Sequence, residues 1–244
     1  MNETHESGHH EMHGAPAGLA STADGLTLET GWIAADDGGR SGTLEFRILG
    51  SDGEPVRDFD DQHGRAMHLM VVRRDLTRYR HLHLRMDAGG TWSAPLAFPH
   101  PGFYRVFADF ATAGRGLTLG RDLEVPGPYE PAPLPAPEGV ARTGGYEVRL
   151  DAELHAEGVA SLVFGVSREG RGVYDLDPYL GALGHLVALR EGDLAFLHVH
   201  PEAEEGSGPR VAFRAVFPSA GRYRLFLQFA HANGVHTAAF TVEV

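Results

Sequence analysis

The feature that most constrains this chain is an internal duplication. Residues 52–84 align without gaps with residues 169–201, and residues 98–110 (FPHPGFYRVFADF) align with residues 217–229 (FPSAGRYRLFLQF). Three histidines in each copy occupy equivalent positions: His68, His81 and His83 in the first copy, and His185, His198 and His200 in the second. A repeat of about a hundred residues is long enough to form a domain with its own core. The sequence therefore predicts two related domains in tandem.

The pattern within each copy predicts β-structure. Short apolar or alternating runs are separated by Gly, Pro, Asp and Asn, and almost no segment has a helical period. Hydrophobic residues make up 42% of the chain, which is enough for real cores. We expect an all-β protein with two tandem immunoglobulin-like antiparallel β-sandwich domains.

The domain boundaries follow from composition. The first residues lack apolar periodicity and contain several histidines, whereas the segment PGPYEPAPLPAP has a proline at nearly every second position and favours an extended connection. The predicted parts are a disordered His-rich tail (1–22), a first sandwich (23–125), a Pro-rich linker (126–143) and a second sandwich (144–244).

The equivalent histidines are candidate metal ligands. In the second copy, Gly192-Asp193 between two apolar runs predicts a hairpin, and its register places His185 opposite His200 and Val187 opposite His198. The three histidines then share one face, where opposed β-carbons lie about 5 Å apart. Imidazoles at such spacings can converge on one ion.

The same register in the first copy places His68 opposite His83 and Met70 opposite His81. A thioether beside imidazoles suits copper, while imidazoles alone also suit zinc, so copper is the expected metal and zinc the alternative. His231 breaks the duplication and is a candidate for completing the second site. Whether the chain holds two sites, or one shared site where equivalent faces meet, stays open.

Composition excludes several classes of function. The net charge of -12 argues against nucleic acid and anionic lipid as partners, and the absence of cysteine excludes thiolate sites and disulfides. The chain contains no run of about 18 apolar residues, so we expect no transmembrane span. No motif of a hydrolase, zinc peptidase or nucleotide-binding enzyme is present, so we expect a binding protein and no enzyme.

The segments HLMVVRRDLTRYRHLHL and HLVALREGDLAFLHVHP resemble uncharacterised secreted or lipid-anchored bacterial proteins, frequent in actinobacteria and often labelled heavy-metal-binding. More distantly, the predicted sandwich and the His/Met usage resemble periplasmic copper carriers of the CopC type and YtkA-like domains. The resemblance implies an extracytoplasmic protein whose leader is absent from this sequence.

Two hypotheses from different classes follow. In the first, the protein binds or carries a transition metal, copper above all, outside the cytoplasm and exchanges it with a partner protein that the sequence does not identify. In the second, it is a metal-free interaction or envelope-structural module, and the histidines only pack between the domains.

Overall fold

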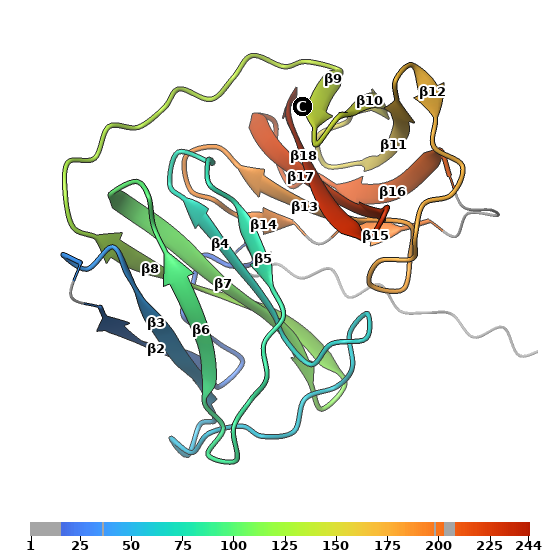
Figure 1. The fold of residues 1–244 in the computed structure, drawn as a ribbon. Helices are drawn as coiled ribbons and strands as arrows, with labels where there is room; N and C mark the ends of the chain where they lie inside the picture. Colours follow the sequence, from blue (N-terminus) through green and yellow to red (C-terminus); the bar gives the residue numbers. More distant parts are fainter. Residues whose placement is uncertain (1–15, 36, 198, 203–207) are drawn as a thin grey trace, which may run out of the picture.

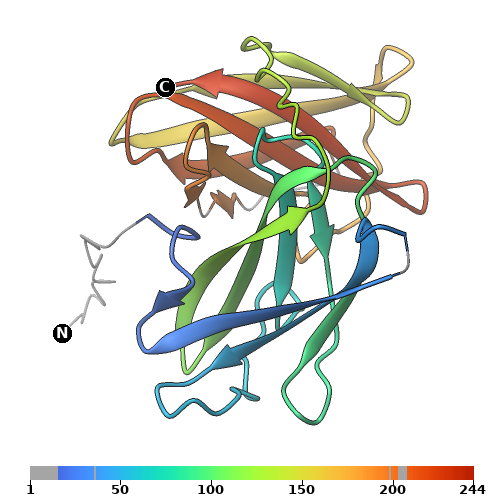
Figure 2. The ribbon, with the colours of Figure 1, turned by 90° about the vertical axis from the view of Figure 1, so that its left-hand side faces the viewer.

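The computed structural model describes residues 16–35, 37–197, 199–202 and 208–244. These residues form strands, turns and loops, and none of them is helical. The strands build two antiparallel sandwiches, one from each copy of the repeat, which lie against each other along one side (Figures 1 and 2). The expected all-β, duplicated immunoglobulin-like fold is confirmed.

Each sandwich has an outer sheet and an inner sheet. In the first, the outer sheet has the order β1-β2-β3-β6, formed by Thr22–Ala23, Leu26–Ala34, Ser41–Leu49 and Trp92–Ala97. The inner sheet has the order β5-β4-β7-β8, formed by Arg80–Leu82, His68–Arg73, Gly102–Thr112 and Arg115–Val125.

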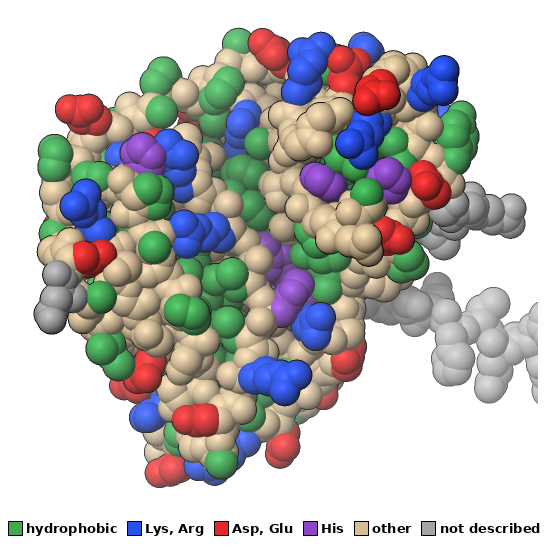
Figure 3. Space-filling model, viewed as in Figure 1, with side chains coloured by type: hydrophobic (Ala, Val, Ile, Leu, Met, Phe, Trp, Pro, Cys, Tyr) green, Lys and Arg blue, Asp and Glu red, His purple; other side chains and the backbone are tan. Residues whose placement is uncertain are grey.

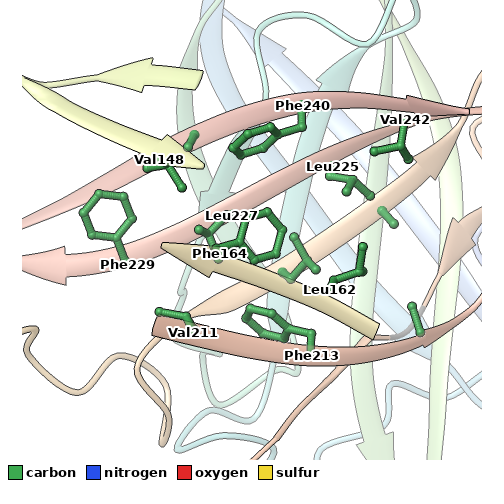
Figure 4. Close-up of a cluster of buried hydrophobic side chains, with 14 of the residues drawn as sticks. Val148, Leu162, Phe164, Val211, Phe213, Leu225, Leu227, Phe229, Phe240 and Val242 are labelled. Carbon is green, nitrogen blue, oxygen red and sulfur yellow. The ribbon is translucent and has the colours of Figure 1, made fainter. Parts of the chain in front are cut away.

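The second sandwich repeats this plan. Its outer sheet has the order β15-β16-β11-β10-β9, formed by Val199–Pro201, Arg210–Val216, Val159–Arg168, Tyr146–Glu153 and Val140–Thr143, with β12 (Arg171–Gly172) paired to β11. Its inner sheet has the order β14-β13-β17-β18, formed by Phe196–Leu197, His185–Arg190, Arg222–His231 and Gly234–Glu243. Figure 4 shows phenylalanines and aliphatic side chains of both sheets filling the core between them.

The two inner sheets face each other, so their strands are covered on both faces. Along β4, Leu69 and Val71 pack into the core of the first sandwich, while Met70 and Val72 pack into a third cluster shared with the second sandwich. The same alternation occurs along β13, which explains why both strands are nearly continuous apolar runs. The molecule is thus a stack of four sheets with three apolar layers.

The contact between the inner sheets has approximate twofold symmetry. Tyr79 stacks on Phe226 with ring centroids 4.2 Å apart, and Phe196 lies against Phe107 at 5.5 Å. In the alignment of the repeats, Tyr79 is equivalent to Phe196, and Phe107 is equivalent to Phe226. Each contact is therefore the counterpart of the other, as in an interface formed by the same surface of two identical subunits.

The start of the described chain differs from the predicted tail. The backbone NH of Phe196 donates to the carbonyl of Ala17 at 2.9 Å, and the Arg105 guanidinium donates to the carbonyl of Gly18. A Cβ on Gly18 would lie 2.7 Å from the Phe107 ring, and its φ of +73° also favours glycine. Ala17 and Gly18 therefore contact both domains, and residues 1–15 of the predicted tail lie outside the described residues.

The connection between the domains is bound along its length. The Arg73 guanidinium donates to the carbonyl of Glu130 at 3.2 Å, and Arg222 donates to the carbonyl of Leu134 at 2.9 Å. Leu134 itself packs against the shared cluster. Residues 140–143, assigned to the linker by composition, form β9 and pair with β10, so the predicted boundary is a few residues too late.

Candidate metal centre

Three histidines of the first domain converge at the edge of the interface. His68 begins β4, His81 lies in β5, and His83 follows β5 directly. The register pairs Met70 with His81, which is the register predicted from the spacing. One ring nitrogen of each histidine lies within 4.8 Å of one nitrogen of each of the others, a spacing that could hold a metal ion. Figure 3 shows histidines in the seam between the two sandwiches.

The second domain closes this group. The His185 ring, at the start of β13, stacks on the His81 ring with centroids 4.6 Å apart and lies 5.9 Å from the His68 ring. Gln228 pairs with His185 in the sheet, and its Oε1 lies 2.7 Å from His81 Nδ1. We refer to His68, His81, His83 and His185 as the histidine cluster.

One hydrogen bond fixes a protonated nitrogen, because His68 Nε2 donates to the carbonyl of Gln62 at 3.0 Å. His81 Nδ1 lies 2.7 Å from Gln228 Oε1 and donates to it when the amide has this orientation. If both rings are neutral, His68 Nδ1 and His81 Nε2 carry lone pairs, and these two atoms face each other at 3.0 Å. Imidazole ligands of metals are oriented in this way, by donating the second ring NH to an oxygen.

Burial keeps the cluster neutral. Together with the neighbouring His68, it lowers the pKa of His83 to about 4 and the pKa of His185 to about 3. Burial also lowers the pKa of His68, and together with His185 it holds the pKa of His81 well below its usual value. Neutral imidazole is the form that binds a metal ion.

Two other ring nitrogens in the cluster have no hydrogen-bond partner among the described residues. His83 Nε2 and His185 Nδ1 are buried and make no hydrogen bond within the described part of the chain. A buried polar atom without a partner costs about 1–3 kcal/mol. A cation among the rings would satisfy such lone pairs, which gives the cluster a physical reason to bind one.

The equivalent hairpin of the second domain keeps only part of the predicted pairing. Its first part keeps the expected register, with Leu189 paired with Phe196, but β15 then joins the outer sheet, where His200 pairs with Arg214. The prediction that His200 lies opposite His185 is therefore wrong. His198 and the side chain of His200 lie outside the described residues.

His231 lies elsewhere. Its Nδ1 is 2.6 Å from the Tyr146 hydroxyl, and its Nε2 is 3.1 Å from Asp175 Oδ1. It follows Gln228, the partner of His185, by three positions, which along a strand means the opposite face and about 10 Å of distance. The structure does not bring His231 to the cluster.

Met70 lies on the same face as His68 and His81, as predicted, and its side chain packs in the shared apolar cluster. Three residues that support the cluster were not predicted: Gln62, Gln228 and Asp109. Asp109 pairs with His68 and is nearly buried, and it aligns with Gln228 in the repeat. The sequence signal for Asp109 and Gln228 is a polar residue inside an apolar run at the same position of both copies.

The fold and the cluster define a duplicated immunoglobulin-like β-sandwich protein with histidines gathered between its halves. The chain belongs to the family described as Domain of unknown function (DUF8832), whose model matches residues 21–127 and 141–244. That description assigns no activity and no ligand. No protein of curated function matches the sequence.

Several solved structures match the chain at low sequence identity and with low TM-scores. Invasin, a bacterial integrin-binding protein, is 14% identical with a TM-score of 0.26, and the match covers 89% of this chain but 38% of invasin. A marsupial T cell receptor is 13% identical with a TM-score of 0.25, covering 90% of this chain and 99% of the receptor. A protein of Corynebacterium diphtheriae described as membrane anchored is 8% identical with a TM-score of 0.28, and the match covers 91% of this chain and 59% of that protein.

None of the described residues forms a helix long and apolar enough to cross a membrane.

Proposed function

We propose that the protein binds one transition-metal ion between its domains, with His68, His81 and His83 as ligands. The observation that carries this proposal is the pair of facing nitrogens, His68 Nδ1 and His81 Nε2, whose opposite ring nitrogens lie 3.0 Å from the Gln62 carbonyl oxygen and 2.7 Å from Gln228 Oε1. Two ligands on one ion at bond lengths of about 2.0–2.1 Å stand about 3.3 Å apart, close to the spacing of these nitrogens. The site is a binding site and not a catalytic one.

Copper is the metal we favour, and zinc is the alternative. Imidazole suits both metals, and the thioether of Met70, paired with His81 in the sheet, would favour copper if it approached the ion. A carrier that works outside the cytoplasm fits this ligand set, because the set contains no cysteine thiol that could be oxidised.

A metal-free arrangement of the same atoms is the competing reading. If the Gln228 amide is turned over, its NH₂ donates to His81 Nδ1, His81 Nε2 donates to His68 Nδ1, and His68 Nε2 donates to Gln62. The cluster then only joins the domains. The two readings differ in whether the cluster takes up a cation, and this can be measured directly.

Titration with Cu(I), Cu(II) and Zn(II) tests the proposal. The four histidines of residues 1–15 (His5, His9, His10 and His13) are replaced by asparagine in every variant, so that they bind no metal. We expect one tightly bound ion per chain and a loss of affinity of at least about 100-fold in His81→Ala, since loss of a supporting hydrogen bond alone costs 10–100-fold.

His155→Ala is the matched control, because His155 is exposed in a loop of the second domain. It should bind with unchanged affinity. Absence of tight binding in the parent protein, or equal affinity in His81→Ala and His155→Ala, would contradict the proposal and leave the metal-free reading.

A further inference from the structure

A groove lies between β18 and the connection of the two domains. Its volume is about 400 Å³, a size usual for ligand pockets. One wall is formed by residues 135–142, and the other is the face of β17 and β18 that carries Arg224 and Thr241. The carbonyl of Pro135 accepts from Arg222 at 2.9 Å, so the wall formed by the connection is held in place.

The groove contains a guanidinium without a charged partner. Arg224 is half-buried, and its Nη1 donates to the Thr241 hydroxyl at 2.8 Å. Its Nε is buried and has no hydrogen-bond partner among the described residues, and Nη2, which is not buried, has none either. Burial lowers the pKa of Arg224, and no carboxylate within the described part of the chain offsets that effect. Such a charge favours an anion that reaches it from outside.

The duplication shows what the same guanidinium binds in the first domain. Arg105 aligns with Arg224 in the repeat. Its Nε donates to the carbonyl of Gly18, and its Nη2 donates to the carbonyls of Gly18 and Leu19. Its Nη1 donates to Asp122 at 2.9 Å. The two nitrogens that bind a peptide segment in the first domain are therefore the two that have no partner in the second.

The acidic partner also differs between the copies. Asp122 pairs with Arg105 across β7 and β8. At the equivalent position of the second domain, Thr241 pairs with Arg224, and a hydroxyl accepts a hydrogen bond without bringing a charge. The carboxylate that lines the groove is that of Glu138, which is exposed and forms no ion pair with another described residue. The second domain thus has the cation without the anion that neutralises it in the first.

The edge of β18 offers backbone groups as well. In the first domain, the segment that contacts Arg105 also bonds to the edge of β8, because its backbone donates to the Thr118 carbonyl and accepts from the Gly120 NH. In the second domain, Thr237 and Ala239 take these positions. The alternation of hairpin bonds leaves the Thr237 carbonyl and the Ala239 NH pointing away from β17. Neither forms a backbone hydrogen bond with another described segment.

We propose that this groove binds a peptide that brings a carboxylate to Arg224 and pairs through its backbone with the edge of β18. A carboxylate suits a guanidinium because its two oxygens can accept from two N–H groups of the same fork. It can belong to the C-terminus of the peptide or to an acidic side chain, since the chemistry at Arg224 is the same. None of the three proposed metal ligands lines the groove, so the inference does not depend on the metal site.

Calorimetric titration of the chelator-treated full chain with four probes tests the proposal. The first is acetyl-Pro-Ala-Gly-Leu, the sequence of residues 16–19, whose free C-terminal carboxylate replaces the Leu19 carbonyl. The second is the same peptide with a C-terminal amide, the third is that amide with Leu19→Asp, and the fourth is acetate. We expect a peptide with a carboxylate to bind with a Kd below about 1 mM and the uncharged amide to bind at least about 10-fold more weakly. The first and third probes distinguish a C-terminus from a side chain as the source.

Arg224→Gln removes the charge and keeps a polar side chain. We expect it to lower the affinity for the better of the two carboxylate peptides at least about 10-fold, the usual loss when a charged hydrogen-bond partner is removed. Arg171→Gln is the matched control, because it removes the same charge from an exposed position on β12 of the same domain. Its affinity should stay within about twofold of the parent value, since solvent screens a distant exposed charge.

Four outcomes overturn the inference. Equal affinities in Arg224→Gln and Arg171→Gln remove Arg224 from the site, and equal affinities of the three peptides remove the carboxylate. Acetate that binds as tightly as the peptides makes the groove a site for small anions. If no probe binds, the groove is not a peptide site. If Arg224→Gln does not fold, the amide resonance of Ala239 in the parent protein decides, because a peptide on the edge of β18 must shift it.

Discussion

The metal-free protein should lose about 4 kcal/mol of its unfolding free energy between pH 7 and pH 5. The cause is the difference between the folded and unfolded pKa values of the buried histidines. Burial lowers the pKa of His185 to about 3 and holds that of His81 well below its usual value, whereas both titrate near 6.5 in the unfolded chain. Below pH 6.5 the unfolded state therefore binds protons that the folded state does not, and stability falls as the pH falls.

The magnitude follows from the width of that window. Each histidine that stays neutral in the folded state costs about 1.4 kcal/mol for every pH unit below 6.5, or about 2 kcal/mol at pH 5. His81 and His185 together give about 4 kcal/mol, a large part of the 5–15 kcal/mol by which domains are usually stable. The sum leaves out His83, which is half-buried, because solvent screens the charge of its protonated ring.

Urea unfolding of chelator-treated protein at pH 7 and pH 5 measures this effect. His185→Leu is the informative variant, since it removes one of the two groups and keeps an apolar side chain at the start of β13. Its stability should depend on pH by about half as much. Equal unfolding free energies at the two pH values in the parent protein would show that the cluster takes up protons without unfolding.

Phe226→Ala should destabilise the protein by about 3–5 kcal/mol, the usual cost of removing a buried phenyl ring. Phe226 is 3% exposed and stacks on Tyr79 across the interface with an interplanar angle of 9°. It is also two residues from Gln228, which accepts from His81. The substitution should therefore loosen the inner sheet of the first domain, although it lies in the second.

Hydrogen exchange measures how far this substitution in the second domain destabilises the first domain. In Phe226→Ala we expect faster exchange of the β4 and β5 amides and weaker metal binding. Phe240→Ala is the matched control, because Phe240 is 2% exposed but packs within the core of the second sandwich. It should cost a similar unfolding free energy and leave β4 protected. Unchanged β4 exchange in Phe226→Ala would mean that the interface contributes little to the first domain.

The repeat made much of the fold predictable. The alignment indicates two equivalent domains. The Gly192-Asp193 turn predicted the register that pairs Leu189 with Phe196, and the same spacing in the first copy predicted the one that pairs Met70 with His81. These features are local, since they depend on side-chain alternation and hairpin length.

The features that decide the site are not local. The strand that contains His200 leaves the inner sheet for the outer one, and nothing in its alternation distinguishes the two partners. From the sequence, contact between the two inner sheets was only one of the possibilities. A strand that is buried on both faces has the same apolar pattern whether its second face is covered by its own domain or by another. Gln228 reaches His81 only because of that meeting.

The covalent connection between the two halves determines how the site responds to dilution. Two separate sandwiches that met through the same pair of sheets would fall apart below their dissociation constant, and the second domain's contribution to the cluster would be lost. In one chain, even a loose tether holds the halves at an effective concentration in the millimolar range, and here the connection is itself bound by Arg73 and Arg222. The histidine cluster consequently stays assembled at any protein concentration, so its affinity for an ion is a property of the single molecule.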